Sequence, residues 1–187
     1  MIAGLREEII TKDREIAKLI ADNDSLATGI NNLREEKGKL GDSLNTTMSA
    51  LAYASILKAE SFKIVGVKSN GKEIDDKEIK GSKIDRLKVS FRIADNKAAK
   101  KDNKLVYIAL VQPSGEVFSD VANGGGTLTL ENGDDVFFTL SQKLKFDNTN
   151  QELTFSMLKG FNYIPGNYSI LAYSEGHKIG EGSFIIK

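Results

Sequence analysis

Apolar residues recur along the first 57 residues at alternating intervals of three and four. With Ile2 as heptad position a, isoleucine and leucine fill most a and d positions, and the phase is kept as far as Leu51. The apolar members of this seam are Ile2, Leu5, Ile9, Ile16, Leu19, Leu26, Ile30, Leu33, Leu40 and Leu44. A helix that only covers its own globular domain needs no strict 3.5-residue repeat of such length. The pattern therefore predicts a long coiled-coil stalk over residues 1–57.

The residue types along the seam predict a parallel homodimer. Isoleucine at a with leucine at d favours two parallel strands, and Asn23 at position a satisfies its amide best against the same residue of a partner in register. Asn23 therefore belongs to the predicted oligomerisation residues. The alternatives are an amphipathic helix packed on its own domain and a helical hairpin bent at Ala27-Thr28-Gly29. The heptad phase continues through Leu26, Ile30 and Leu33, which favours one uninterrupted helix.

From Ser61 onward the pattern changes to the two-residue alternation of β-strands. Residues 87–93 alternate apolar and polar, and residues 105–111 form a nearly continuous apolar run suited to a central strand. Turn dipeptides such as Asn70-Gly71 and Asn132-Gly133 separate the segments. The other predicted strands are residues 62–67, 116–121, 127–130, 136–140, 143–146, 152–157, 168–173 and 178–186.

The end of the β region carries a more specific signal. Pro165-Gly166 forms a turn signal just before Tyr168, which opens an alternating strand. This order is similar to a tyrosine corner, in which the phenol bonds back to the upstream backbone. A hairpin around Gly176 closes the predicted sheet. Short strands without helical segments between them predict an immunoglobulin-like Greek-key β-sandwich over residues 58–187. The expected fold class is thus α plus all-β, a coiled-coil helix followed by that sandwich.

Composition and charge exclude several classes of protein. Lys and Arg number 26, as do Asp and Glu, so the 187-residue chain has no net charge to attract nucleic acid or an anionic membrane. Cysteine is absent, which excludes disulfides, thiolate metal sites and thiol nucleophiles. These residues contain neither an apolar run of membrane-spanning length nor a leader pattern.

Several segments together resemble a group of uncharacterised bacterial envelope proteins. They are the heptad stalk, the strand patterns in residues 63–67, 83–91 and 104–108, and the closing segments at residues 165–168 and 178–184. Members of that group carry an N-terminal membrane anchor, a periplasmic coiled coil and a terminal immunoglobulin-like domain, and some are labelled chromosome-partitioning proteins. The resemblance implies a periplasmic or envelope location, with inner-membrane anchoring through a segment outside this chain.

Candidate polar sites are few. His177 is the only histidine, so it can build neither a zinc site nor a Ser-His-Asp relay with other histidines or cysteines, and we expect a solvated turn residue. Acidic loop clusters could hold calcium, but none has the ligand spacing of an EF-hand, and acidic residues at turns usually just face water. These clusters are Asp75-Asp76, Asp134-Asp135 and Asp147-Asn148 with Asn150.

The basic segments and the glycine-rich segment can also be explained without a binding site. Four lysines between Lys97 and Lys104, and the residues Arg86, Lys88 and Arg92 on one strand face, could form a surface patch for acidic ligands. We expect them instead to protect a sheet edge from aggregation. The run 124–126 of three glycines joins two predicted strands and opens no helix, so no phosphate loop is predicted.

The sequence predicts no catalytic, cofactor-binding or metal-binding residue. The leading hypothesis is a non-enzymatic scaffold of the cell envelope whose dimeric stalk presents the sandwich to a protein, peptide or glycan. One alternative is an envelope carbohydrate-binding or hydrolytic module, for which Phe118, Phe161 and Tyr163 are the loop aromatics to consider. The other is a chromosome-associated coiled coil, which would require DNA binding. The leading hypothesis expects no nucleic acid partner.

Overall fold

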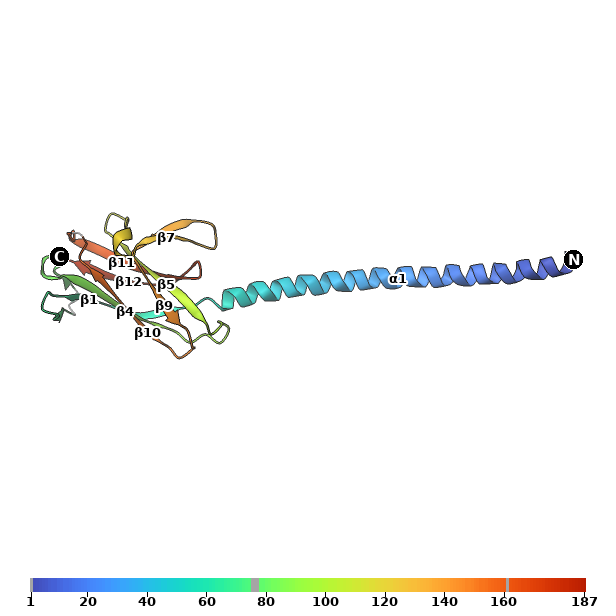
Figure 1. Cartoon of the computed structure of the whole chain (residues 1–187), viewed down its shortest axis with the longest axis horizontal. Coiled ribbons are helices and arrows are strands. Elements are labelled where there is room, and N and C mark those ends of the chain that lie inside the picture. The colour runs from blue at the N-terminus through green and yellow to red at the C-terminus, as the bar shows by residue number, and fades with distance from the viewer. Residues whose placement is uncertain (1, 75–77, 161) are drawn as a thin grey trace. The chain divides into compact units, whose positions relative to one another are not determined.

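A computed structural model describes residues 2–74, 78–160 and 162–187 (Figure 1). The chain forms two compact units, Met1–Leu51 and Ala52–Lys187. Among the described residues, no helix has both the length and the apolar composition required to cross a bilayer.

The first unit consists of one unbroken helix, α1, which spans Ile2–Ala54 and ends within the second unit. It continues through residues 27–29, so the hairpin alternative is wrong. Thr28 lies inside the helix, and its Oγ1 donates to the carbonyl of Asp24 at 2.9 Å. The helix ends three residues before the predicted boundary at 57, and Ser55 closes it by donating its Oγ to the carbonyl of Ala52 at 2.7 Å.

The second unit is built of antiparallel β-strands, with one parallel pairing. Its elements are β1 (Ala59–Val67), β2 (Glu73–Ile74), β3 (Glu78–Ile79), η1 (Gly81–Lys83), β4 (Arg86–Ile93), β5 (Asn103–Val111), β6 (Val117–Phe118), η2 (Val121–Asn123), β7 (Gly126–Thr129), β8 (Asp135–Phe138), β9 (Leu140–Lys145), β10 (Glu152–Leu158), β11 (Gly166–Ser174) and β12 (His177–Ile186).

The strands form two larger sheets and a hairpin. One sheet has the order β10-β4-β1-β2, and the other has the order β3-β12-β11-β5-β6, with β9 also paired to β5. The strands β7 and β8 form the separate hairpin. The pairing of β3 with β12 is parallel, whereas the other pairings are antiparallel. Figure 1 shows β4 and β10 side by side.

The two larger sheets pack against each other through one hydrophobic core. Leu87, Val89 and Phe91 of β4 contribute from the first sheet, and Ile108 of β5 and Ile170 of β11 from the second, all of them buried. The alternation of residues 87–93 is thus the expected half-buried strand with one face on the core. The described residues therefore form a β-sandwich.

The predicted tyrosine corner is confirmed. Tyr168 is fully buried in β11, and its hydroxyl donates to the carbonyl of Ile164 at 3.0 Å and accepts from the amide of Ile164 at 3.1 Å. Burial raises the pKa of Tyr168, partly offset by this backbone bond. The ring also stacks on Phe184 at a centroid distance of 5.4 Å, which ties the corner to β12.

One predicted strand is wrong over most of its length. Residues 116–121 were expected to be extended, but only Val117–Phe118 form a strand, and η2 begins at Val121. The carboxylate of Asp120 caps this turn by accepting from the amide of Ala122 at 3.0 Å. A capping aspartate competes with the extended conformation.

Candidate functional site

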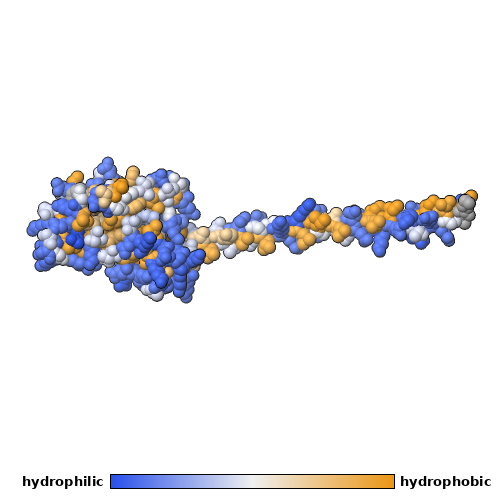
Figure 2. Space-filling model, viewed as in Figure 1, coloured by the Kyte–Doolittle hydropathy of each residue, from blue (hydrophilic) through white to orange (hydrophobic). Residues whose placement is uncertain are grey.

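The predicted seam of α1 is exposed along its whole length. Asn23 and the apolar seam residues have solvent-exposed side chains in the single chain. Figure 2 shows apolar residues distributed along the helix between hydrophilic ones. Because α1 is one continuous helix, the three-and-four spacing of its a and d positions places them on one face. The structure therefore leaves the seam available to a partner helix.

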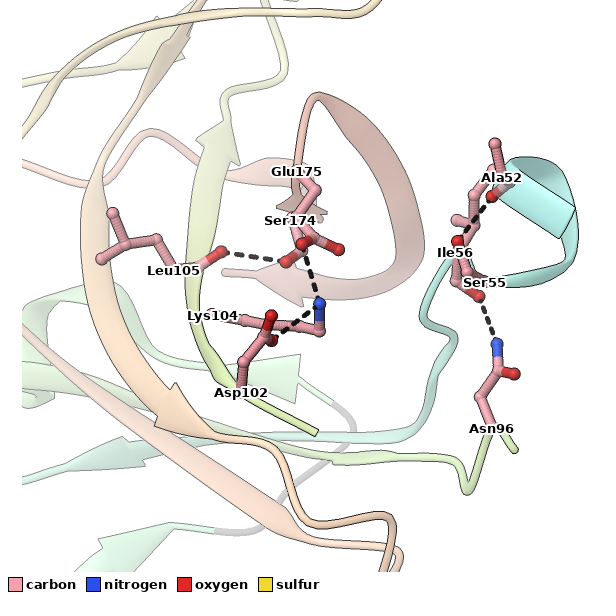
Figure 3. Close-up of polar contacts among 9 residues, drawn as sticks. All are labelled: Ala52, Ser55, Ile56, Asn96, Asp102, Lys104, Leu105, Ser174 and Glu175. Atoms are coloured by element: carbon pink, nitrogen blue, oxygen red, sulfur yellow. Dashed lines mark hydrogen bonds and ion pairs between the residues drawn. The ribbon is translucent and has the colours of Figure 1, made fainter. Parts of the chain in front are cut away.

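Lys104 does not belong to the predicted surface patch of lysines. Its side chain is only 3% exposed, and its Nζ lies 2.7 Å from Glu175 and 3.1 Å from Asp102 (Figure 3). Burial alone would lower the pKa of Lys104, but the hydrogen bonds and negative charges of Glu175 and Asp102 outweigh it and hold the pKa above its ordinary value of 10.5. Beside it, Ser174 donates to the carbonyl of Leu105. Lys104 therefore ties the start of β5 to the β11–β12 turn.

The basic face of β4 is largely neutralised. Lys88 forms an ion pair with Glu73 at 2.7 Å, and Arg92 stands opposite Glu60 of β1 and Glu152 of β10. Opposite charges across strands attract each other and reduce the local field. This arrangement does not favour nucleic acid binding by the sandwich.

His177 lies at the start of β12, directly after the predicted hairpin turn. Its Nε2 lies 3.2 Å from a carboxylate oxygen of Glu131, which is in the β7–β8 turn. The amide of Glu131 also donates to the carbonyl of Gly176 at 3.1 Å. The histidine is thus partly buried rather than fully solvated, and it helps to join two turns.

Phe118 and Tyr163, two of the three aromatics considered for glycan binding, pack against the hydrophobic core. Phe118 is half-buried in β6, and Tyr163 is half-buried with its ring edge-to-face on Tyr168 at 5.9 Å. Burial raises the pKa of the Tyr163 phenol, with a smaller contribution from Tyr168. Phe161 lies outside the described residues.

Asn96 is a connecting residue that sequence reasoning did not identify. Its Nδ2 donates to the carbonyls of Ala54 at 2.8 Å and Ile56 at 3.0 Å, just where α1 ends (Figure 3 labels Asn96 and Ile56). Its Oδ1 accepts from the amide of Ala98, and its own amide donates to Asn148. Helix ends leave carbonyls without partners inside the helix, and Asn96 satisfies one of them. A lone asparagine in a loop gives no pattern from which this role could be predicted.

A surface cavity of about 890 Å³ lies close to Asn96 in the second unit. Its lining includes Tyr53, Leu57, His177 and Gly180. Two lining side chains have partners within the protein, since the Nε2 of His177 lies 3.2 Å from Glu131 and Lys178 forms an ion pair with Glu181. The size suits a small molecule.

Residues 60–187 match the family described as "Domain of unknown function (DUF8428)". The chain belongs to this family. No curated protein matches the chain. The DUF8428 domain begins within β1 and includes the remaining strands of the sandwich.

Solved structures resemble the chain only distantly. An immunoglobulin-like protein from Pseudomonas aeruginosa has 9% identity and a TM-score of 0.38, covering 70% of this chain and 96% of that one. An alkylpurine DNA glycosylase from Pseudomonas fluorescens, bound to DNA containing an abasic site analog, has 15% identity and a TM-score of 0.40, covering 71% and 31%. A β-glucosidase from Listeria innocua in complex with glucose has 14% identity and a TM-score of 0.39, covering 70% and 15%. The chain thus spans less than a third of the two enzymes.

In the acidic loops of the DUF8428 domain, the carboxylates accept hydrogen bonds from residues of the same turn. Asp134 accepts from the Nδ2 of Asn132 at 2.6 Å, and Asp147 accepts from the amide of Thr149 at 3.0 Å. Asp75-Asp76 lies outside the described residues. Over the ranges that the structure describes, no three His, Asp or Glu side chains gather closely enough to hold a metal ion.

The run of three glycines in the DUF8428 domain allows a backbone conformation and a close backbone contact that other residues would disfavour. Gly124 follows η2 with a φ of 95°, in the left-handed region that favours glycine. A Cβ on Gly125 would lie 2.7 Å from the amide nitrogen of Asp120. The run therefore allows a close return of the chain beside Asp120, and it opens strand β7.

Proposed function

We propose that the chain is a non-enzymatic scaffold of the bacterial cell envelope, in which two parallel copies of α1 form a coiled-coil stalk that presents paired β-sandwich domains. The observation that supports this proposal best is a continuous helix of 53 residues whose heptad seam is exposed. At about 1.5 Å per residue, such a helix is roughly 80 Å long. A solitary helix that exposes so many isoleucine and leucine residues gains free energy by covering them.

Asn23 favours a parallel partner in register. In that arrangement Asn23 faces the same residue of the partner and apolar layers face apolar layers, although Lys12 and Lys37 also face their own copies and their like charges reduce the gain. A shift by one heptad places Asn23 opposite Ile16 and Ile30. The antiparallel register with full overlap places it opposite Leu33. Either arrangement buries an amide against an aliphatic side chain, which costs free energy.

The topology supports an immunoglobulin-like Greek-key assignment for the sandwich. The strands β10, β4 and β1 are adjacent in one sheet, while β12, β11 and β5 are adjacent in the other. The tyrosine corner at Tyr168 opens β11, as it does near the start of the corresponding strand of immunoglobulin domains. Domains of this architecture commonly act in recognition, which agrees with a presenting stalk.

The envelope location rests on the resemblance of the stalk and strand patterns to anchored periplasmic proteins. Fractionation of cells that express the native gene tests it, and recovery of the protein in the cytosolic fraction alone would reject it. The carbohydrate and DNA alternatives gain no support from the site, because Phe118 and Tyr163 pack against the core, and because Lys88 and Arg92 of β4 lie beside carboxylates.

The oligomeric state is the direct test of the stalk. Light scattering of residues 1–187 over a concentration series should give the mass of a dimer, and crosslinking through a cysteine introduced at Leu19 should join like positions of two chains. A monomer at every concentration would refute the scaffold proposal. A dimer in which the two introduced cysteines do not crosslink would refute its parallel form, because an antiparallel helix places Leu19 opposite Lys37.

A further inference from the structure

The strand β10 forms a long edge of the sandwich. It pairs with β4 on one side, and no further strand pairs with it within the described residues. It has seven residues and shows no register shift against β4. Natural edge strands are usually shortened, bulged, or protected by lysine or proline. β10 has none of these features.

The backbone groups of β10 that face outward can be identified from its hydrogen bonds. The amide of Ile93 donates to the carbonyl of Gln151 at 2.8 Å, and the amide of Lys159 donates to the carbonyl of Asp85 at 2.7 Å. In an antiparallel pair, alternate residues direct both backbone groups toward the partner strand. The odd-numbered residues 151–159 therefore bond to β4. The even-numbered residues Glu152, Thr154, Ser156 and Leu158 direct their amides and carbonyls away from it.

The edge of β9 provides a contrast on the neighbouring side of the sandwich. The amide of Phe146 donates to the carbonyl of Asp102 at 2.9 Å, so the odd-numbered residues of β9 face outward. Two of these, Lys143 and Lys145, are exposed lysines. Lysines protect an edge against pairing with another strand, whereas β10 carries a single charge, Glu152.

A small groove lies beside the end of β10. Its volume is about 100 Å³, and it is lined by the apolar residues Phe118, Leu140, Met157 and Leu158 together with polar residues that include Asp120. Leu158 itself is 64% exposed. This volume is about three times that of a water molecule in the liquid, which suits one aliphatic side chain.

The carboxylate of Asp120 in the groove lining already accepts hydrogen bonds from the amide of Ala122 and the Nδ2 of Asn123, whereas Arg86, on the neighbouring strand, has no such partner among the described residues. Arg86 faces Leu158 across the β4–β10 pair and Val67 on its other side. Unlike Lys88 and Arg92, Arg86 has no cross-strand carboxylate in the part of the chain that the structure describes. An acidic side chain on an incoming strand would find this guanidinium next to Leu158, which lines the groove.

We propose that β10 binds an extended segment of a partner protein, which adds to the sheet as a further strand, places an aliphatic side chain in the groove and carries an acidic residue near Arg86. Strand addition of this kind takes its affinity from backbone hydrogen bonds and its specificity from side-chain pockets. The inference deepens the proposed function, since it names the ligand class of the presented sandwich. It does not depend on the dimer.

The test uses random nonapeptides displayed on phage, selected against the full chain. Enriched peptides should combine an aliphatic residue with an acidic one. The Ser156→Pro variant removes an outward amide without removing a bond to β4, and it should weaken binding of the enriched peptides about tenfold or more. Ser141→Pro makes the same change at the outward edge of β9, and binding should stay within about twofold of the original chain because no docking is proposed there.

A second measurement covers the case in which Ser156→Pro does not fold. The amides of residues 152, 154, 156 and 158 of the unmodified chain should exchange with deuterium more slowly when an enriched peptide is added, while other edge amides stay unchanged. Absence of enrichment, protection elsewhere, or equal losses in the two proline variants would overturn the proposal. A lower mass of Ser156→Pro in light scattering would also overturn it, because the occupant would then be a second copy of this chain. The dimer test on the stalk fails or succeeds separately from these results.

Discussion

Two isoleucines of α1 allow the stalk to be tested with a matched pair of substitutions. Ile30 and Ile10 have nearly equal exposed fractions in the single chain, 49% and 51%. Ile30 occupies position a of the seam, whereas Ile10 occupies position b, which points away from a partner helix. Replacement by alanine changes helix propensity by the same amount at both positions. Any difference between Ile30→Ala and Ile10→Ala therefore reports association.

The expected magnitude follows from the area available for burial. Full burial of an isoleucine side chain contributes about 1.5–3 kcal/mol, and about half of the surface of Ile30 is exposed before association. Each copy thus contributes about 0.8–1.5 kcal/mol and each dimer layer about 1.5–3 kcal/mol. The dissociation constant should rise about 10- to 150-fold for Ile30→Ala. It should stay unchanged for Ile10→Ala.

Sedimentation equilibrium over a concentration series measures both dissociation constants, and circular dichroism at 222 nm checks that the helix content is preserved. Equal weakening in the two variants would show that the apolar surface acts without a heptad seam. An unchanged dissociation constant for Ile30→Ala would remove this layer from the interface. Either result would refute the assignment of position a.

Three further predictions concern the seam, the tyrosine corner and alkaline pH. Asn23→Ile should raise the melting temperature of the stalk and broaden the oligomer distribution seen by light scattering, since an apolar layer replaces the amide pair; no change in either would place Asn23 outside the seam. Tyr168→Phe should lower the free energy of unfolding of the sandwich by about 2 kcal/mol in urea titrations, because two backbone groups of Ile164 lose their partner; an unchanged midpoint would contradict this. Burial raises the pKa values of Tyr163, Tyr168 and Tyr173 above 10.0, so the unfolded chain releases protons first and stability should fall as the pH rises above that value; a constant midpoint through this range would contradict the assignment.

The sequence predicted the features that depend on local periodicity. Residues 87–93, in which apolar and polar side chains alternate, lie in β4. The turn before Tyr168 forms a tyrosine corner with the expected bond to the backbone. The segment with the uninterrupted heptad phase forms one helix. In each case the spacing of apolar residues or a turn dipeptide determines the local structure. The association of two such helices remains a prediction.

Features that depend on long-range pairing were missed. The strands β2 and β3 have two residues each, and their extended form comes from pairing with β1 and β12 rather than from any alternation. Asn96 contacts α1 across about forty residues of sequence, as its bonds to Ala54 and Ile56 show. Spacing along the chain carries no information about such contacts.

The sequence contains an indication that Lys104 is buried and does not belong to a surface patch. Residues 104, 106, 108 and 110 share one face of β5, and Val106, Ile108 and Leu110 are buried. Alternation therefore places Lys104 on the core side and Leu105 on the outer side, despite their polarity. The neighbouring carboxylates of Asp102 and Glu175 make this burial tolerable, because they neutralise the ammonium group at the rim of the sheet.

The two proposed interfaces, the seam of α1 and the edge of β10, recognise their partners by different physical means. The seam of α1 uses side chains in fixed layers, so it is selective for one register. The edge of β10 uses backbone groups, which every extended peptide offers, and only the groove and Arg86 restrict the choice. Recognition by β10 alone is thus expected to be tolerant and weak. A stalk that holds two such edges together converts the second binding event into an intramolecular one, which strengthens binding to a partner with repeated segments without any new contact. The stalk would then serve affinity as well as presentation.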